Sequence, residues 1–434
     1  MLDSFKKLPA REVIATPENQ KSIYKILKWQ VFMSATIGYG LYYVCRLSLN
    51  VVKKPIVDSG FLTESQLGLI GSALFFSYAL GKFVNGFLAD YSNIKRFMST
   101  GLLISSLINL MLGFVDGFLF FAICWGINGW VQSMGAPSSV VSLSRWFKDK
   151  ERGSFYGFWS TSHNIGEALT YILTAVVASY FGWQWGFKIA GIIGIVGAII
   201  IAVFFHDSPE SKGLPTVSKE ESMLKLATRD QQLAVLKNPY IWILALSSAF
   251  MYISRYAVNS WGPYYFETAK GYSLTQANTL ISISAICGIL GTAFSGFISD
   301  RFFHGKRNIP VACFGLMNIT SLSLFLLGPK DMWLLDAISM VLFGLAIGAL
   351  ICYLGGLMAV DLASKEASGA ALGIVGIMSY AAAGIQDITS GILIENNKTV
   401  IAGEIIYDFS SITIFWIASA VISMLLALLV WKKV

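Results

Sequence analysis

Apolar stretches of about twenty residues recur along nearly the whole chain, separated by short polar connectors. A helix needs roughly 20 apolar residues to cross the hydrocarbon core of a bilayer, because each residue adds only about 1.5 Å. Twelve stretches reach this length: 29–52, 65–88, 97–115, 118–144, 154–179, 185–205, 239–262, 274–298, 308–328, 333–360, 368–394 and 409–431. They predict an all-α membrane protein with twelve transmembrane helices.

The composition places this chain in lipid rather than in water. Hydrophobic residues make up 55% of it and charged residues 13%, whereas soluble globular proteins carry about 25% charged residues. The longest polar connector, 207–238, follows the sixth apolar stretch and predicts a linker between two halves. We therefore expect a tail at 1–28, a six-helix bundle at 29–206, the linker at 207–238 and a second six-helix bundle at 239–434.

The basic residues are distributed unevenly among the connectors. If the N-terminus lies in the cytoplasm, 23 of the 32 Lys and Arg residues fall in cytoplasmic segments and five in segments on the other side. Cytoplasmic loops of membrane proteins carry such an excess. We therefore expect both termini to be cytoplasmic, and the net charge of +7 to reflect topology rather than nucleic-acid binding. The three His residues lie far apart in the sequence, so we expect no metal, no cofactor and no enzyme activity.

Short motifs repeat at an offset of about 210 residues. A hydroxyl residue followed by Gln three positions later opens the second and eighth apolar stretches, as Thr63-x-x-Gln66 and Ser273-x-x-Gln276, which is typical of a capping box. The pattern Gly86-x-x-x-Asp90 returns in the same way as Gly296-x-x-x-Asp300. These motifs resemble those of the major facilitator superfamily. The resemblance implies two pseudo-symmetric six-helix bundles around a central cavity, with the substrate near the membrane midplane.

Two arginines lie inside apolar stretches, where an unpaired charge costs roughly 2.5–3.5 kcal/mol. Arg46 is in the first stretch and Arg255 in the seventh, 209 positions apart, so the two are equivalent in the repeat. In the fold that the resemblance implies, these two helices face each other across the cavity. Two guanidiniums converging there suit a phosphate group, which accepts bidentate hydrogen bonds on several oxygens. The alternative is that each arginine reaches toward the interface or forms a structural ion pair.

The fifth apolar stretch carries a histidine and an acid one helical turn apart, His163 and Glu167. They belong to a run that reads Arg-Gly, five residues, Trp-Ser, two residues, His-Asn, one residue, Gly-Glu over 152–167. This run resembles the signature of the organophosphate:phosphate antiporter family, which includes hexose-phosphate transporters and a hexose-phosphate sensor. It departs from that signature twice, because Ser160 replaces an Asn and Glu167 replaces a Gly. Taken alone, His163 could equally be a hydrogen-bonded packing residue.

The resemblance extends to further residues of this chain. The two essential arginines of the family correspond to Arg46 and Arg255, which are expected to bind phosphate. Lys82 and His163 are expected to supply further hydrogen-bond donors. The residues expected to contact the phosphate or the sugar are Tyr39, Tyr43, Tyr78, Gln132 and Asn259.

Two acids, Glu167 and Asp387, complete the predicted substrate site. Asp387 lies in the eleventh apolar stretch and either contributes to the site or pairs with Lys82 or an arginine. If both acids were ionised, the positive charge of the cavity would be low for a phosphate dianion. We therefore expect at least one of them to be salt-bridged away from the phosphate or protonated when substrate binds.

These features predict a secondary active transporter that exchanges an organophosphate, such as glucose 6-phosphate, for inorganic phosphate by alternating access. The alternative is a membrane sensor for external hexose phosphate, since the family contains a sensor with the same pocket. The short loops and the basic tail favour the bacterial inner membrane over the endoplasmic reticulum. We expect a monomer embedded in the bilayer, with a phosphate ester and inorganic phosphate as its ligands.

Overall fold

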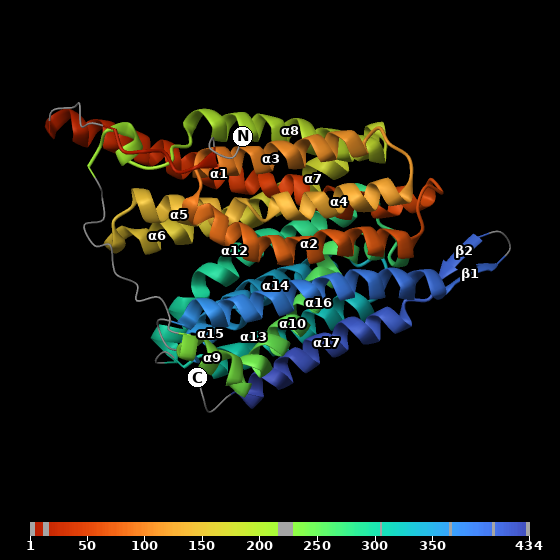
Figure 1. The fold of residues 1–434 in the computed structure, drawn as a ribbon. Helices are drawn as coiled ribbons and strands as arrows, with labels where there is room; N and C mark the ends of the chain where they lie inside the picture. The colour runs from red at the N-terminus through yellow and green to blue at the C-terminus, as the bar shows by residue number, and fades with distance from the viewer. Residues whose placement is uncertain are drawn as a thin grey trace.

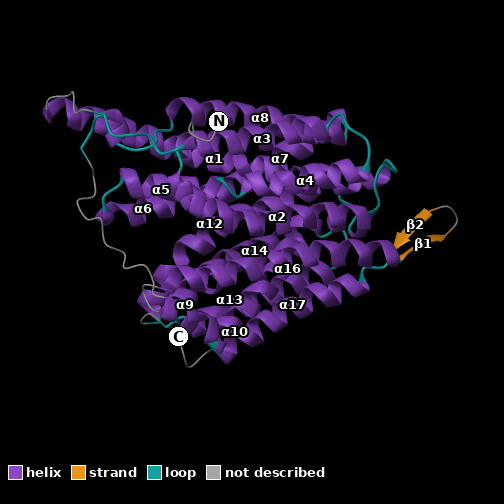
Figure 2. Ribbon diagram, viewed as in Figure 1, coloured by secondary structure: helices purple, strands orange, loops and turns teal. Residues whose placement is uncertain are grey.

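The computed structural model describes residues 5–11, 17–215, 229–303, 306–363, 367–401 and 404–430. Within this part of the chain the regular secondary structure is helical apart from an isolated bridge between Lys6 and Ser92 and one antiparallel hairpin. The hairpin is formed by β1 (Lys398–Ile401) and β2 (Glu404–Tyr407) at one end of the molecule (Figure 2). The all-α prediction therefore holds except at this hairpin, which falls in a segment that we expected to be a simple connector.

The helices form two halves that lie alongside each other (Figure 1). The N-half contains α1 (Pro17–Asp58), α2 (Glu64–Tyr91), α3 (Ile94–Leu112), α4 (Phe118–Gln132), α5 (Gly135–Trp146), α6 (Asp149–Ser160), α7 (Ser162–Phe181) and α8 (Trp183–Phe204). The C-half contains α9 (Arg229–Lys237), α10 (Pro239–Tyr256), α11 (Gly262–Ala269), α12 (Leu274–Phe302), α13 (Asn308–Leu327), α14 (Trp333–Cys352), α15 (Met358–Asp361), α16 (Ser368–Asn396) and α17 (Ser410–Leu429). Two short π-helical segments, η3 (Ala257–Trp261) and η4 (Tyr353–Leu357), lie within the C-half.

Each half packs mainly within itself. In the N-half α1 packs against α7 and α8, α3 against α8, and α2 against α4. In the C-half α10 packs against α16 and α17, and α14 against α12 and α13. The halves meet where α2 contacts α16 and where α7 contacts α12. These two seams bring residues from distant parts of the sequence to one central region.

Eight helices of the described residues are long and apolar enough to cross a membrane: Glu64–Tyr91, Trp183–Phe204, Pro239–Ala269, Leu274–Ser299, Asn308–Leu327, Trp333–Asp361, Ser368–Asn396 and Ser410–Leu429. Their outer faces carry exposed apolar side chains, such as Leu80, Phe83 and Phe87 on α2, which lipid can solvate and water cannot. The other four predicted spans coincide with helices that are more polar (α1 and α3) or divided (α4–α5 and α6–α7). The protein is therefore a multi-pass membrane protein, and the number twelve stays a prediction.

The first helix is longer at both ends than the predicted span 29–52. It begins at Pro17, inside the segment expected to be a tail, and ends at Asp58. The prediction that Lys53 lies in a connector is wrong, because its side chain is completely buried. The helix continues past this lysine to Asp58, and a carboxylate of the other half neutralises the buried charge. The predicted linker includes α9, and its residues 216–228 lie outside the described residues.

Both predicted capping boxes are confirmed. At the start of α2, Thr63 Oγ1 accepts from the Gln66 N–H at 3.3 Å, and the Gln66 side chain accepts from the Thr63 N–H at 3.0 Å. At the start of α12, Ser273 and Gln276 make the same two bonds at 3.3 and 3.0 Å. Each box satisfies backbone donors that a helix start would otherwise leave without partners.

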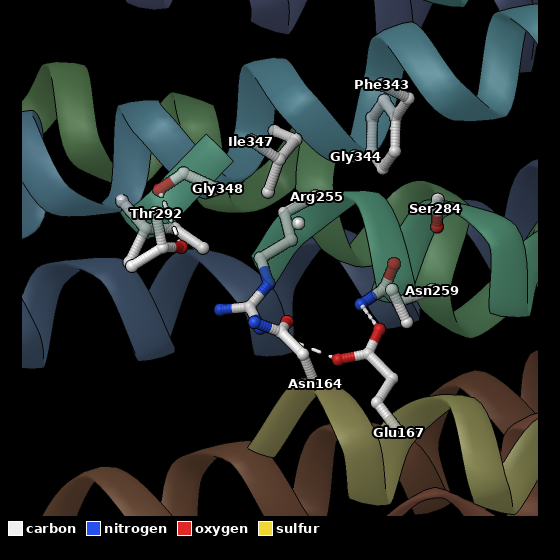
Figure 3. A pocket seen from close by; sticks show the side chains of 13 residues that line it. Asn164, Glu167, Arg255, Asn259, Ser284, Thr292, Phe343, Gly344, Ile347 and Gly348 are labelled. Atoms are coloured by element: carbon white, nitrogen blue, oxygen red, sulfur yellow. Dashed lines mark hydrogen bonds and ion pairs between the residues drawn. The ribbon is translucent and has the colours of Figure 1, made fainter. Parts of the chain in front are cut away.

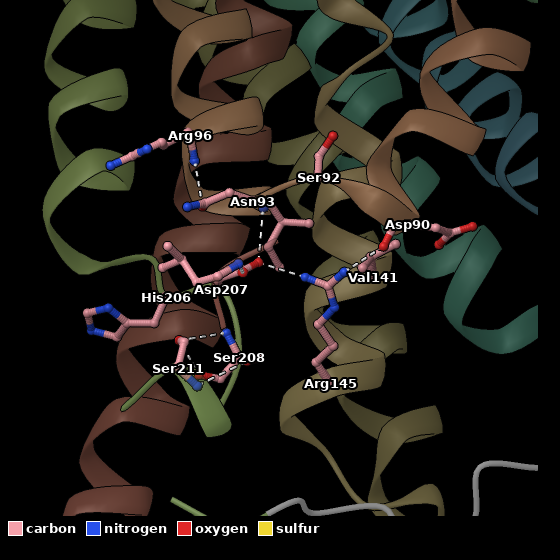
Figure 4. Close-up of polar contacts among 12 residues, drawn as sticks. Asp90, Ser92, Asn93, Arg96, Val141, Arg145, His206, Asp207, Ser208 and Ser211 are labelled. Atoms are coloured by element: carbon pink, nitrogen blue, oxygen red, sulfur yellow. Dashed lines mark hydrogen bonds and ion pairs between the residues drawn. The ribbon is translucent and has the colours of Figure 1, made fainter. Parts of the chain in front are cut away.

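The connector after α8 is tied to the N-half by Asp207 (Figure 4). Its carboxylate accepts from Arg145 Nη1 at 2.6 Å, from the Ile94 N–H at 3.1 Å and from the Leu8 N–H at 2.9 Å. Arg145 also donates to the backbone carbonyl of Asp90 at 2.9 Å. A single buried carboxylate thus joins α3, α5, the N-terminal segment and the connector at the end of the molecule that we call the linker end.

At the opposite end, which we call the hairpin end, the two halves are in backbone contact. A Cβ added at Gly68 would lie 2.5 Å from the Asp387 carbonyl oxygen, and one at Gly391 would lie 2.4 Å from the Glu64 carbonyl oxygen. Only glycine fits where two helices approach this closely. The Glu64 carboxylate of α2 is buried and accepts from three C-half groups, Tyr264 Oη at 2.9 Å, Lys398 Nζ at 2.7 Å and Tyr407 Oη at 2.8 Å.

The same two helices separate toward the linker end. A Cβ added at Gly86 of α2, or at Gly369 or Gly373 of α16, would meet no atom within 4 Å. Along the α2–α16 seam the structure therefore passes from close backbone contact at the hairpin end to open space at the linker end. At this seam the halves are therefore in contact at the hairpin end and apart at the linker end.

Candidate functional site

Arg46 projects from the middle of α1 and is 3% exposed. Its guanidinium lies over two tyrosine rings, 4.1 Å from the Tyr78 centroid and 4.7 Å from the Tyr43 centroid. Its Nε donates to Gln132 Oε1 at 3.4 Å, and Gln132 in turn donates to Ser105 Oγ at 2.7 Å. Arg46 Nη2 is buried and has no hydrogen-bond partner within the described part of the protein. A buried guanidinium with an unused donor is suited to an anion that enters from the cavity.

Arg255 occupies the equivalent place in the C-half, in the last turn of α10. It is 5% exposed, and its guanidinium lies 5.7 Å from the Tyr252 centroid and 5.3 Å from the Tyr256 centroid. The helix changes to the π-helical segment η3 directly after Tyr256. Such π-bulges occur frequently at functional sites, because the inserted residue changes the direction of the side chains that follow. Asn259 lies in this segment, four residues after Arg255, and the two side chains line the same cavity.

Glu167 crosses from α7 in the N-half to both of these residues (Figure 3). Its Oε2 lies 3.8 Å from Arg255 Nη2, and its Oε1 accepts from Asn259 Nδ2 at 2.5 Å. The carboxylate is 3% exposed. The cavity beside it is lined by Asn164, Arg255 and Asn259 and by uncharged residues of α12 and α14. Glu167 is therefore the ion-pair partner of Arg255, the arginine that the sequence predicts to bind phosphate.

A cluster of tyrosines connects the cationic groups. The Tyr380 ring of α16 lies tilted at 4.6 Å from the Tyr78 ring and meets the Tyr252 ring edge-on at 5.4 Å, measured between ring centroids. Lys82 of α2 is exposed, and its Nζ lies 5.3 Å from the Tyr380 centroid. The Tyr380 hydroxyl is within electrostatic reach of Lys82 and of both arginines. Tyr380 thus lies between positive charges of both halves, with Lys82 over its ring and the two arginines at the neighbouring tyrosines.

The remaining predicted residues of the N-half lie around the same cluster. Tyr39 stacks on Trp159 at 4.9 Å and meets Tyr43 edge-on at 5.6 Å, again between centroids. The His163 ring lies 5.6 Å from the Tyr43 ring, and His163 Nδ1 contacts the carbonyl oxygen of Ser160. With Nδ1 occupied by its own helix, the Nε2 atom is the one left for a ligand.

Asp387 has a different partner from those that the sequence suggested. It pairs with Lys53 Nζ at 2.9 Å and accepts from Ser260 Oγ at 2.7 Å, and both charged side chains are fully buried. The expected alternatives, Lys82 or an arginine, are not its ion-pair partners within the described residues. Asp387 thus contributes to the contact between the halves, next to the α2 backbone at Gly71.

Sequence reasoning missed three tyrosines and one lysine of this region: Tyr252, Tyr256, Tyr380 and Lys53. One signal was available, because Tyr43 and Tyr252 are 209 positions apart, the same offset that relates Arg46 to Arg255. Tyr380 has no charged neighbour in the sequence to draw attention to it.

Comparison with known proteins identifies the family of this sequence. The sequence model of the Major Facilitator Superfamily matches residues 35–386. The chain belongs to this superfamily. Within it the chain belongs to the organophosphate:phosphate antiporter family, as the motifs around Arg46, His163 and Arg255 predicted.

Three curated relatives illustrate the range of this family. A probable hexose phosphate transport protein of Chlamydia trachomatis is 35% identical over 390 residues, which cover 85% of each chain. The membrane sensor protein UhpC of Salmonella typhimurium is 32% identical, with 88% of this chain and 89% of the sensor covered. The glycerol-3-phosphate transporter of Bacillus subtilis is 31% identical, with 88% of each covered.

Solved structures agree with the superfamily fold. A bacterial homologue of the human lysosomal transporter Spinster aligns with a TM-score of 0.73 at 16% identity, covering 93% of this chain and 97% of the homologue. The nucleoside transporter NupG aligns with a TM-score of 0.72 at 17% identity, covering 94% and 98%. At these identities the likeness concerns the fold alone. The chain thus has both the sequence family and the fold of this superfamily.

Proposed function

We propose that this protein exchanges an organophosphate for inorganic phosphate across the bacterial inner membrane by alternating access. The observation that carries the proposal is the pair Arg46 and Arg255, one from each half, both buried at a shared tyrosine cluster. A phosphate group held between them would draw the two halves together, because each guanidinium can donate to different oxygens of one anion.

The closed hairpin end and the open linker end indicate the side of the membrane from which the site is accessible. The excess of basic residues on the linker side favours a cytoplasmic linker end, so the separation of α2 and α16 there corresponds to access from the cytoplasm. In the opposite state, the contacts of Glu64 and the Lys53–Asp387 pair would open and the halves would close at the linker end. Substrate would then enter from the other side of the membrane.

The charge of the cavity supports an anionic substrate with a polar body. Arg46 and Arg255 suit the phosphate, and Lys82 lies where an approaching anion would pass, because it is exposed next to Tyr380. Gln132 and Asn259 each carry amide groups close to an arginine. Such groups suit sugar or glycerol hydroxyls, and relatives that transport hexose phosphate and glycerol 3-phosphate support this substrate class.

A sensor is the second candidate, because UhpC resembles this chain as closely as the transporters do. A transport assay separates the two. Vesicles containing the purified protein are loaded with radiolabelled inorganic phosphate and diluted into glucose 6-phosphate, glycerol 3-phosphate or buffer. A transporter releases the label rapidly when one of the esters is present. The variant Lys330→Met, at an exposed position of the connector between α13 and α14, is the control and should behave like the unmodified protein.

Release no faster than in protein-free vesicles, with ester binding retained, would favour a sensor and contradict the proposal.

A further inference from the structure

The Glu167 carboxylate is paired with Arg255 across the two halves. Glu167 belongs to α7 of the N-half, while its partners Arg255 and Asn259 belong to the C-half, at 3.8 and 2.5 Å. All three side chains are buried. The cavity beside them has space for about one water molecule (about 20 Å³). The carboxylate thus stands where the proposed function requires a phosphate oxygen to reach Arg255.

Few other charges face this carboxylate within the described residues. From α10 it meets Arg255, and from α1 it is within electrostatic reach of Arg46. On its own helix the titratable neighbours are His163, one turn earlier, and Tyr171, one turn later, whose hydroxyl donates to the Asn259 carbonyl. The cavity lining supplied by α12 and α14 is uncharged. The second buried acid, Asp387, is neutralised separately by Lys53.

A phosphate dianion and an ionised Glu167 cannot both be stable at Arg255. Like charges a few ångströms apart repel strongly away from water, and a buried carboxylate next to an anion is favoured in its neutral form. The carboxylate can accept a proton without losing its other contact, because a protonated carboxyl still accepts from the Asn259 amide on one oxygen. Proton uptake is therefore the local change that frees Arg255 for phosphate.

We propose that Glu167 takes up one proton when a phosphate ester binds and releases it when the ester leaves, so that the protein also carries out net, proton-coupled ester transport. This inference rests on the proposed function, because it assumes the ester site at Arg46 and Arg255. The proton enters the site from the side on which the ester binds and leaves on the side of release.

The charges of the four states explain the coupling. With Arg46, Arg255 and Glu167 counted, the empty deprotonated site carries one positive charge, and the protonated site with a bound dianion carries none. The protonated empty site carries two positive charges. The deprotonated site with a dianion carries one net negative charge and places like charges together at Arg255. The empty deprotonated protein and the protonated protein with bound dianion change conformation most readily. The empty protein can therefore return without phosphate, and an ester crosses together with a proton.

The test uses vesicles free of phosphate and ester, with pH 7.5 outside, pH 8.5 inside and the membrane potential held at zero by potassium and valinomycin. At both pH values the ester is a dianion, because its second pKa is near 6. The unmodified protein should accumulate labelled ester up to about tenfold, the limit for one proton per ester across one pH unit. Glu167→Gln, which keeps the shape and an acceptor for Asn259, should lose this accumulation.

A second arm measures ester-for-ester counterflow at pH 8 on both sides, where Glu167→Gln should stay active. The matched control is Glu267→Gln on α11. This variant removes an acid of the C-half that lies outside the site, and it should behave like the unmodified protein in both arms. Equal pH-driven accumulation by Glu167→Gln, or counterflow without any such accumulation by the unmodified protein, would overturn this inference. Absence of counterflow in the unmodified protein would overturn the proposed function, and the inference with it.

A binding measurement keeps the inference falsifiable if Glu167→Gln does not fold. Calorimetric titration of the purified unmodified protein with glucose 6-phosphate at pH 8, in buffers of different ionisation enthalpy, counts protons taken up on binding. One proton per bound ester is expected, and none would overturn the inference.

Discussion

The side-chain nitrogen of Lys53 lies 2.9 Å from a carboxylate oxygen of Asp387, and neither side chain is exposed. The pair joins α1 of the N-half to α16 of the C-half, near the hairpin end. Ser260 links the two charges further, since it accepts from Lys53 at 2.7 Å and donates to Asp387 at 2.7 Å. The Lys53 nitrogen also lies 3.8 Å from the Trp261 ring centroid. A charge pair this deep holds the halves together only while both members are present.

Removal of Lys53 alone should destabilise the protein strongly. Lys53→Met leaves the Asp387 carboxylate buried without a counter-charge, which costs about 3–5 kcal/mol when a buried pair is broken. Adding Asp387→Asn removes the uncompensated charge, so the double variant should recover most of the lost stability. Thermal unfolding in detergent compares the unmodified protein, the two single variants and the double variant. A double variant that is less stable than either single variant would show that the two residues do not act as a pair.

The three donors to Glu64 should hold the hairpin end closed. Glu64→Gln keeps the size of the side chain but weakens its bonds to Lys398, Tyr407 and Tyr264, because charge-assisted bonds are roughly twice as strong as neutral ones. We expect the halves to open there more often. Spin labels at the exposed positions 59 and 330, one in each half, should report a larger fraction of long distances in this variant.

The control for this measurement is Ser179→Ala at the exposed end of α7, which removes a hydroxyl bonded to the Val176 carbonyl of its own helix and should leave the distances unchanged. An unchanged distance distribution in Glu64→Gln would mean that the backbone contacts of the glycines keep this end closed without the carboxylate.

Lys82 should act on the approach of the anion more than on the later steps. It is exposed, and its ammonium group lies over the face of Tyr380. Exposed charges attract ligands over a distance that salt screens. We expect Lys82→Met to raise the half-saturating ester concentration about three- to tenfold with little effect on the maximal rate. The dependence of transport on ionic strength should also weaken. A lower maximal rate at unchanged half-saturation would instead place Lys82 in the conformational step.

The sequence was sufficient for the features that follow a local or repeated pattern. The capping boxes at Thr63 and Ser273 depend on residues three positions apart, and the structure has both. The equivalence of Arg46 and Arg255 follows from the internal repeat, and both arginines are buried at the same cluster. In each case the prediction depends only on residues close in the sequence or on the repeat distance between the two halves.

The features that the sequence did not predict depend on contacts between distant residues. Lys53 was assigned to a connector because a lysine normally ends an apolar stretch, yet its partner Asp387 is 334 positions away. Tyr380 lies in an apolar stretch like any packing residue, and only the fold brings it between Tyr78 and Tyr252. The departure of Glu167 from the family signature was visible, but its contact with Arg255 required the two halves to be assembled.

The role of the two arginines is tested most directly by exchanging each for lysine and measuring ester-stimulated release of labelled phosphate from vesicles. Arg46→Lys and Arg255→Lys keep the charge but lose the planar fork that donates to two oxygens at once. Each should reduce exchange at least about 50-fold while the protein stays folded. Arg96→Lys, at the surface of the linker end, is the matched control and should exchange at the unmodified rate. Exchange near the unmodified rate in Arg46→Lys or Arg255→Lys would remove that arginine from the phosphate site and contradict the central claim.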